Sequence, residues 1–380
     1  MALVSIVVVA YNAEAFVAEC LASISGQTYG DWEALLIDDG SEDATGHLFV
    51  ELAKRDNRVK VILKENGGTS SARNSGLSAC TGEWVWFVDA DDWLELRALE
   101  EMEALLRETD ANIVGINHFF NFDTLPQKGK ERQPIAWKAT PICPEVLVRE
   151  GREEVKWLAL GAMSPYYVEK RTGLRFGPMR EGWSKLFRRS FLETHNIRFE
   201  EILSLTEDTV FCFDAFMYAS KVVLYNRYLL HYRLHALSKE RCFQPEMKRI
   251  NELTMESFCK RMDQWGRKDE DFRPAFLGMC ADRLFGMMRC YVLHEELHSV
   301  VPRKKRRAVL RETLQGRIWQ SLREDKQDLR FLPRGKRELV YCIQQEWYGA
   351  ACLLGRLLLW GIRQRAYLRR WEKLLLAREG

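Results

Sequence analysis

The sequence predicts an α/β protein whose mostly parallel sheet is flanked by helices and followed by a helical C-terminal extension. Two observations support this prediction. Short apolar runs alternate with segments of helical spacing over residues 4–116, which is typical of a doubly wound parallel sheet. From Pro245 onward the pattern is helical. We therefore expect two domains, an α/β domain over residues 1–240 and a helical domain over residues 241–380.

The elements of the α/β domain are expected in a regular order. The run Trp84–Val88 lacks polar alternation, so both faces of this strand should be covered. Residues 117–165 are interrupted by prolines and are expected to form loops and short elements. The expected strands span residues 4–10, 32–37, 59–63, 84–88, 113–116, 222–225 and 229–232, and the expected helices span residues 13–27, 43–55, 71–80, 95–107 and 210–219.

Composition narrows the class of protein. The 380 residues are 47% hydrophobic and 29% charged, which is ordinary for a globular protein. The ten cysteines are scattered without a C-x-x-C pair, which favours reduced thiols over disulfides or zinc. The first residues lack a basic n-region and soon reach Tyr11-Asn12, so we expect a strand there and not a signal peptide. No uncharged stretch is long enough to span a bilayer, and a cytoplasmic location is expected.

The net charge of +3 is unevenly distributed. Residues 301–380 hold 20 basic against 8 acidic residues (+12), and the first 300 residues hold 37 against 46 (−9). A basic, Leu- and Trp-rich tail of about 30 residues can lie in a membrane interface, or it can be a core helix with a solvated basic face. The charge favours an anionic membrane surface, on the inner face of the plasma membrane. No nucleic-acid module accompanies it, so a nucleic-acid partner is not expected.

An acidic cluster follows the fourth strand. The apolar run Trp84–Val88 ends in Asp89-Ala90-Asp91-Asp92, at the end of a strand where open α/β sheets bind ligands. Carboxylates this close repel one another unless a cation offsets their charge. Oxygen ligands of this kind suit Mg²⁺ or Mn²⁺. The alternative is a solvated turn in which Asp91 or Asp92 caps the next helix.

Other polar residues follow the neighbouring strands. In a right-handed parallel sheet all strand-to-helix turns lie at one edge. We therefore expect Asn12, Asp38-Asp39, the Asn66 loop and the acidic cluster to meet there.

Together these segments resemble the family 2 glycosyltransferases, which have the Rossmann-like GT-A fold. The resemblance covers roughly residues 1–240, and its motifs do not identify the substrate. It rests on Val4–Asn12, Asp38-Asp39-Gly40-Ser41, Asn66–Gly76, Asp89–Asp92, Trp183–Phe187, Glu207-Asp208 and Tyr232–Ser238. It implies a nucleotide-sugar donor, usually a UDP-sugar, and inversion at the anomeric carbon by direct displacement.

The resemblance also implies a donor site. A carboxylate of Asp38 or Asp39 would accept the uracil N–H, although Asp-Gly-Ser also suits a helix cap. Arg73 would approach the diphosphate from behind a glycine loop, unless it is an ordinary surface arginine. The residues carried over to donor binding are Val9, Tyr11, Asn12, Asp38, Asp39, Gly68, Arg73, Asp89, Ala90 and Asp91.

The metal, Mn²⁺ or Mg²⁺, would be held mainly by Asp91, with Asp89 nearer the ribose or the metal's waters. His235 is carried over as a third ligand or a diphosphate contact, and His231 is its competitor. A structural role is the alternative for a lone histidine. Asp92 is expected to be structural.

Asp208 is the expected general base towards the acceptor hydroxyl, with Glu207 as the runner-up. Trp183 and Lys185 are expected to line the acceptor side, although Trp183 can also be a core residue. The resemblance implies transfer to a hydroxyl of a glycan or lipid-linked acceptor in cell-surface polysaccharide synthesis. The alternative is a non-catalytic or nucleotide-binding relative that acts as a scaffold. A dinucleotide-binding oxidoreductase is disfavoured, because no G-x-G-x-x-G follows the first strand.

Overall fold

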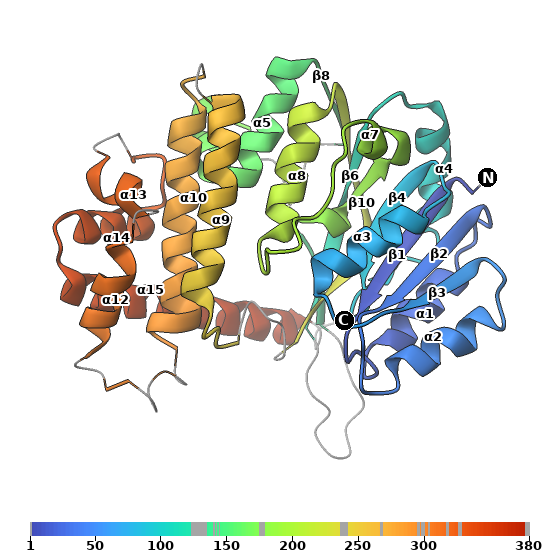
Figure 1. The fold of residues 1–380 in the computed structure, drawn as a ribbon, viewed down its shortest axis with the longest axis horizontal. Helices are drawn as coiled ribbons and strands as arrows, with labels where there is room; N and C mark the ends of the chain where they lie inside the picture. Colours follow the sequence, from blue (N-terminus) through green and yellow to red (C-terminus); the bar gives the residue numbers. More distant parts are fainter. Residues whose placement is uncertain are drawn as a thin grey trace. The chain divides into compact units, whose positions relative to one another are not determined.

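The computed structural model describes most of the chain. The described residues are 2–122, 135–139, 141, 143, 145–174, 179–235, 242–266, 269–294, 297, 301–302, 305–316, 319–325 and 329–376, with the side chains of 122, 135 and 363–376 left out. Their strands form one sheet in the order β3-β2-β1-β4-β9-β6-β10-β5, with β7 paired to β6 and β8 to β10. Helices flank this sheet (Figure 1), so the predicted α/β class is confirmed.

The first half of the sheet is parallel, as predicted. β1 (Val4–Ala10) lies between β2 (Trp32–Asp38) and β4 (Trp84–Asp89), and β3 (Val59–Leu63) extends the sheet beyond β2. Every residue of β1 and β2 is buried, because helices cover the sheet. The connecting helices are α1 (Val17–Ser25), α2 (Thr45–Ala53) and α3 (Thr69–Ala79).

The second half of the sheet is mixed. β9 (Lys185–Arg188) runs antiparallel between β4 and β6 (Ile113–Phe122), and β10 (Lys221–Leu234) runs parallel to β6. The two short strands expected over 222–232 are one strand, because a bulge between Tyr225 and Leu230 absorbs the irregular pattern. The remaining strands, all antiparallel to their partners, are β5 (Trp93–Leu94), β7 (Ile135–Lys138) and β8 (Val146–Glu150).

The segment expected to be mostly loops contains more regular structure than predicted. β6 continues to Phe122, and β7, β8 and α5 (Arg152–Met163) follow it in the described part. The alternating exposure of β8 comes from pairing with β10, more than 70 residues later in the chain. Local periodicity does not reveal such a pairing. The other helices of the first 235 residues are α4 (Ala98–Glu108), α6 (Pro165–Thr172), α7 (Arg189–Thr194), α8 (Glu207–Tyr218) and the 3₁₀ helix η1 (Gly182–Ser184).

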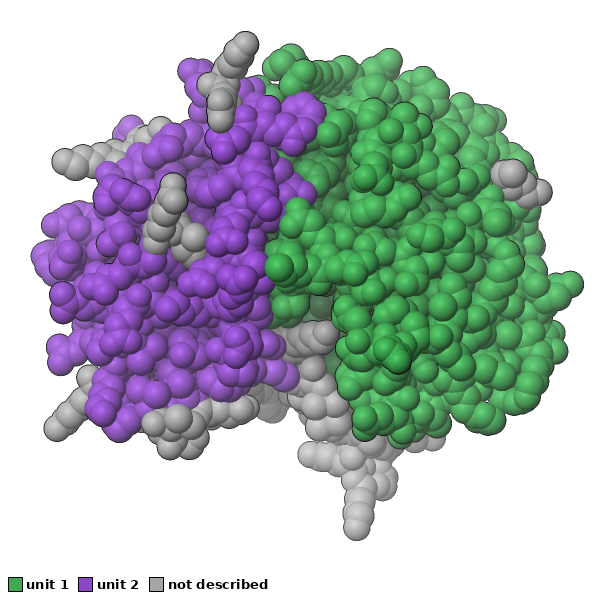
Figure 2. All heavy atoms as spheres, in the orientation of Figure 1, with its two compact units in different colours: residues 1–162, 174–235 green, residues 163–173, 236–380 purple. Residues whose placement is uncertain are grey.

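The chain divides into two compact units, coloured separately in Figure 2. The first unit is residues 1–162 and 174–235, and the second unit is residues 163–173 and 236–380. Residues 163–173 thus belong with the C-terminal residues, and the functional division at residue 240 stays a prediction.

The C-terminal residues are helical, as predicted. They form α9 (Met247–Arg261), π-helix η2 (Met262–Gly266), α10 (Phe272–Met287), π-helix η3 (Met288–Val292), α12 (Arg306–Leu314), α13 (Gln320–Glu324), α14 (Arg334–Gln344) and α15 (Tyr348–Leu376). Among the described residues, no helix combines the length and the hydropathy needed to cross a membrane. All ten cysteines are free thiols.

Glycine lets α3 pack closely against the sheet. A Cβ atom at Gly76 would lie 2.4 Å from Cγ1 of Val7 on β1 and 3.3 Å from Cγ1 of Ile37 on β2. This close packing holds α3 against the central strands and sets the position of Arg73, one turn earlier on the same helix.

Candidate active site

The carboxyl ends of the central strands bring the predicted polar residues to one edge of the sheet. Val9 pairs with Ile37 on one side and Asp89 on the other, and Ala10 pairs with Asp38. The Ala90 backbone N–H also donates to the Val9 carbonyl, at 3.3 Å. The segments after β1, β2 and β4 therefore begin side by side, as expected for parallel strands.

Arg73 lies at the centre of the candidate site. Its side chain is buried, and one terminal nitrogen donates to Oδ1 of Asp89 at 2.8 Å. The other terminal nitrogen donates to Asp208 and lies 3.6 Å from Oε1 of Glu207. Three carboxylates offset the guanidinium charge, which would otherwise be costly to bury. Arg73 thus joins the acidic cluster on β4 to the Glu-Asp pair at the start of α8.

Asp208 has the environment of a proton acceptor. Its Oδ2 accepts a hydrogen bond from the Gly182 backbone N–H at 3.2 Å. Burial, opposed by Arg73 and reinforced by Glu207 and Asp89, raises the pKa of Asp208 to about 7. The carboxyl group is therefore poised to gain or lose a proton near neutral pH. Beside it, Oε2 of Glu207 is buried without a hydrogen-bond partner in the described part of the chain.

The acidic cluster has the composition of a divalent-cation site. One oxygen from each of Asp89, Asp91 and Asp92 lies within 4.8 Å of the others. Nε2 of His235 lies 2.8 Å from Oδ2 of Asp91, and Phe16 packs on the imidazole at 4.7 Å. Carboxylate oxygens and an imidazole nitrogen suit Mn²⁺ or Mg²⁺, so the residues present fit the predicted metal.

Asp92 has a different environment from its neighbours. It is fully buried, and its Oδ1 accepts the Arg233 backbone N–H at 2.8 Å. Burial, together with Asp91 and Asp89, raises its pKa well above the usual range. Its hydrogen bond anchors the Asp89–Asp92 turn to β10, which agrees with the structural role expected for it.

His231, the competitor of His235, is occupied elsewhere. Its Nε2 lies 2.7 Å from Oε1 of Glu95 and its Nδ1 lies 2.9 Å from Nδ2 of Asn121. The imidazole stacks between Trp93 and Phe119. His235 is therefore the histidine that the structure places at the acidic cluster.

Asp38, the last residue of β2, and Asp39, the residue after it, both stabilise turns. Oδ1 of Asp38 accepts the Ser41 backbone N–H at 3.0 Å, so Asp38 closes the turn that follows it. Asp39 accepts hydrogen bonds from Lys64 Nζ at 2.7 Å and from the backbone N–H groups of Gly67 and Gly68 at 3.0 and 2.8 Å. Gly68 has a φ of 86°, which favours glycine. Both carboxylates are buried, and a contact with uracil stays a prediction.

Asn12 and Tyr11 lie at the exposed side of the same edge. Asn12, with a φ of 51°, donates its backbone N–H to Ser41 Oγ, and its Oδ1 accepts the Glu42 N–H. These bonds tie the turns after β1 and β2 together. Tyr11 is 50% exposed, so it is available to a ligand.

Trp183 and Lys185 are core residues. Trp183 stacks on Tyr232 with centroids 5.0 Å apart, and its carbonyl accepts the Trp86 indole N–H. Lys185 is 1% exposed, and its Nζ donates to the Glu181 carbonyl at 2.7 Å. Their positions give no support to the expected acceptor contacts, and the core alternative for Trp183 is the one observed. The same aromatic pattern serves a core and a sugar site, so sequence could not separate them.

Arg233 is a site residue that sequence reasoning did not single out. Its Nε donates to the Asp91 carbonyl at 2.7 Å, and its guanidinium pairs with Glu19. It also lies over the rings of Trp93 and Phe16. Arg233 therefore fixes the backbone of the acidic cluster. The available signal in the sequence was that Arg233 lies within the family segment Tyr232–Ser238.

Known proteins match most of the first unit of this chain. Residues 5–195 match the family described as Glycosyl transferase family 2. EpsH of Bacillus subtilis is 31% identical over 246 residues, 64% of each chain. EpsJ of the same organism is 31% identical over 231 residues, 61% of each chain. The cholesterol galactosyltransferase of Borreliella burgdorferi is 29% identical over 225 residues, 59% of this chain and 58% of that one.

A solved structure shares the fold. Residues 1–349 of S. aureus TarS, in complex with UDP-GlcNAc, match with a TM-score of 0.62 and 18% identity, over 95% of this chain and 92% of that one. The chain therefore shares its fold with TarS and about three fifths of its length with the relatives named above. With a family match over residues 5–195, half of its length, the chain belongs to glycosyl transferase family 2.

Proposed function

We propose that the protein is an inverting, metal-dependent glycosyltransferase. It transfers a sugar from a UDP-sugar to a hydroxyl of a glycan or lipid-linked acceptor in cell-surface polysaccharide synthesis. One observation carries this proposal: Arg73 bonds both to Asp89, one of the candidate metal ligands, and to Asp208, the candidate base. A diphosphate-binding cation, a metal site and a base thus lie together.

Each side chain has a role in the proposed displacement. Asp208 accepts the proton of the attacking acceptor hydroxyl. Arg73 supplies positive charge for the donor diphosphate as the bond to the sugar breaks. Glu207, 3.6 Å from Arg73, helps to hold the guanidinium in place. Tyr11 and the Asp38-Asp39 turn receive the uridine.

Asp91 and Asp89 would hold Mn²⁺ or Mg²⁺, with His235 as a third ligand. The ion would supply Lewis-acid stabilisation of the charge on the departing UDP. Arg233 and Asp92 keep the turn in place, because the Asp92 carboxylate accepts the Arg233 backbone N–H and the Arg233 Nε donates to the Asp91 carbonyl.

The proposal is tested by calorimetric titration of UDP with and without Mn²⁺. We expect binding to tighten with Mn²⁺ in the intact protein, and Asp91→Ala to lose that metal dependence. Asp110→Ala, which removes a carboxylate with a 75% exposed side chain, is the matched control. Metal dependence that survives Asp91→Ala would overturn the ligand assignment.

Measuring turnover of a UDP-sugar distinguishes the proposed enzyme from a non-catalytic scaffold. Slow hydrolysis of a UDP-sugar donor, screened first with UDP-GlcNAc, is the expected result. A chain that binds UDP with Mn²⁺ but neither hydrolyses nor transfers any donor would support the scaffold.

A further inference from the structure

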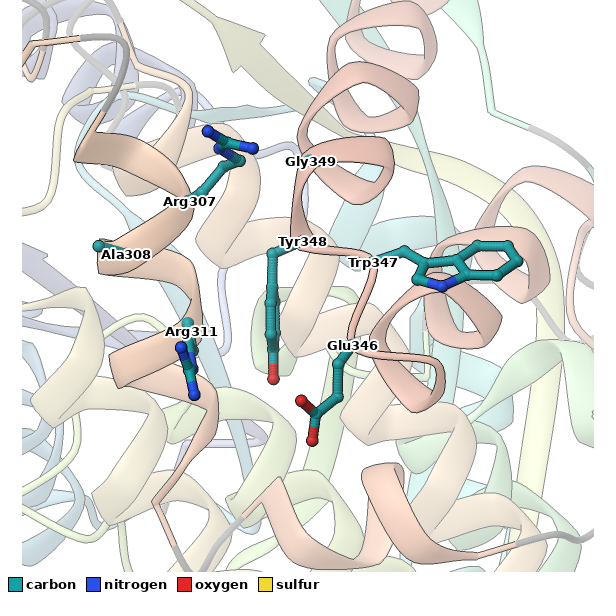
Figure 3. A pocket seen from close by; sticks show the side chains of 7 residues that line it. All are labelled: Arg307, Ala308, Arg311, Glu346, Trp347, Tyr348 and Gly349. Atoms are coloured by element: carbon teal, nitrogen blue, oxygen red, sulfur yellow. The ribbon is translucent and has the colours of Figure 1, made fainter.

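The second unit carries a pocket of about 500 Å³ where α12 meets the start of α15. Figure 3 shows Arg307 extending from α12 towards Gly349 at the start of α15, with Arg311 one turn further along α12. Glu346 contributes the one carboxylate among the lining residues. A Cβ atom at Gly349 would lie 3.3 Å from Cδ of Arg307, so the glycine gives the arginine room. The complete lining is Arg307, Ala308, Arg311, Glu346, Trp347, Tyr348 and Gly349.

In the described part of the chain, the arginines that line this pocket form no ion pair with its one carboxylate, Glu346. Within the described part of the chain, the guanidinium groups of Arg307 and Arg311 make no hydrogen bond or ion pair. Arg306, the residue before Arg307, is 1% exposed, and none of its three guanidinium nitrogens has a hydrogen-bond partner among the described residues. Burial and then Arg356 lower the pKa of Arg306. A buried guanidinium without a counter-charge is costly, so an anion bound nearby would relieve it.

The same group of arginines surrounds a thiol on α15. Burial raises the pKa of Cys352, and Arg356, Arg306 and Arg307 oppose that rise. Three guanidinium groups thus lie near the Cys352 thiol in the first turns of α15. Together with Arg311, they form a cationic cluster at this end of the second unit.

A row of apolar side chains begins beside this pocket. Leu353, Leu357 and Trp360 on α15 are 59%, 57% and 63% exposed. Spacings of three and four residues place them on one face of the helix. Gly349, which lines the pocket, lies on the same face, four residues before Leu353. The pocket and the apolar row therefore form one continuous surface, which we name the α12–α15 surface.

We propose that the α12–α15 surface binds a bilayer that contains anionic phospholipids. Arg307 and Arg311 contact the headgroup phosphates, which a guanidinium binds with two parallel hydrogen bonds. Leu353, Leu357 and Trp360 enter the interface, where indole rings and apolar side chains are stable. The charge of +12 on residues 301–380 attracts the same surface.

A membrane explains both halves of the surface. A free phosphate ion would satisfy the arginines but leave three large apolar side chains in water. An apolar ligand alone would leave the guanidinium groups unpaired. The proposal concerns where the protein works and does not depend on the proposed transfer reaction.

The test is co-sedimentation of the intact protein with lipid vesicles. Vesicles of pure phosphatidylcholine are compared with vesicles containing about 30% phosphatidylglycerol, an anionic lipid. Arg307→Gln with Arg311→Gln tests the pocket, and Leu353→Ser with Leu357→Ser and Trp360→Ser tests the apolar row. The matched controls are Lys54→Gln with Arg55→Gln, and Leu63→Ser with Leu96→Ser, which alter exposed residues of the first unit.

We expect binding to anionic vesicles only. Each basic side chain near an anionic surface contributes about fivefold to partitioning, so the double arginine variant should bind about 25-fold more weakly. The triple serine variant should also lose at least about tenfold, while both controls bind like the intact protein. UDP titration of every variant should match the intact protein, so failure of the proposed enzyme would be seen separately.

Two results would overturn the proposal. One is that the intact protein does not bind anionic vesicles, or that the two test variants bind them as well as the intact protein does. The other is that inorganic phosphate raises the melting temperature of the intact protein, but not that of the arginine variant, while vesicles do not bind. In that case the pocket serves a soluble anion.

Discussion

At the scale of single residues, Arg73 is the side chain on which the candidate site depends. Its two terminal nitrogens bond to carboxylates that are 16 residues later and 135 residues later in the sequence. A buried cation with several acidic partners keeps those partners in fixed positions, because breaking any pair leaves an uncompensated charge.

Asp208→Asn tests the base at this scale. The amide keeps the shape but cannot accept the hydroxyl proton, so transfer should fall by about 10²–10⁴-fold. UDP-sugar affinity, measured by calorimetry, should change little, because Asp89 and Glu207 still hold Arg73. Glu207→Gln is the matched comparison and should slow transfer less. An equal loss of binding and transfer in Asp208→Asn would place the base elsewhere.

His118 gives the first unit a pH-dependent stability. The imidazole is buried edge-on against Trp183, and neither ring nitrogen has a hydrogen-bond partner in the described residues. Burial, and then the charge of Lys185, lowers its pKa from 6.5 to about 4. Between these values the unfolded chain binds the proton and the folded chain does not. This contribution to stability is therefore complete above pH 6.5 and lost as the pH falls to 4.

The expected loss from His118 over that range is about 3 kcal/mol. Urea unfolding at a series of pH values measures it, and His118→Phe should remove this part of the pH dependence. His47→Gln, at an exposed histidine, should leave it in place. An unchanged pH profile in His118→Phe would show that the imidazole is not the group responsible.

At the scale of elements, the contact between α3 and β1 sets the site geometry. Gly76→Ala would place its Cβ 2.4 Å from the Val7 side chain, in the middle of the sheet. We expect a loss of about 1–3 kcal/mol in the free energy of unfolding, despite the better helix propensity of alanine. Ser78→Ala, at an exposed position of α3, should be neutral or slightly stabilising. A stabilised Gly76→Ala would mean that α3 can move away from the sheet.

At the scale of the whole molecule, every residue proposed to bind the nucleotide-sugar donor lies in the first unit. Hydrogen exchange of the intact protein, followed by peptide mass spectrometry, locates the effect of UDP with Mn²⁺. Peptides covering the ends of β1, β2 and β4 should exchange up to about a hundredfold more slowly at a ligand concentration of 100 Kd. Peptides of α12 and α15 should not change. Protection confined to the second unit would contradict the proposed donor site.

The sequence by itself determined the α/β class, the order of the first strands and helices, and the residues that gather at the carboxyl edge of the sheet. These features follow from local patterns, because apolar periodicity defines an element and parallel pairing fixes which ends meet. The family motifs added Asp208 and His235, which lie far from the acidic cluster in the sequence.

Only the tertiary structure decided which side chains touch. It buried Arg73 among three carboxylates. It placed His235, and not His231, beside the acidic cluster, and it placed Trp183 and Lys185 in the core. It also brought Arg307 and Arg311 together with the start of α15 at one pocket. Such contacts depend on how distant segments pack against one another, and a local pattern of apolar and polar residues looks the same before and after that packing.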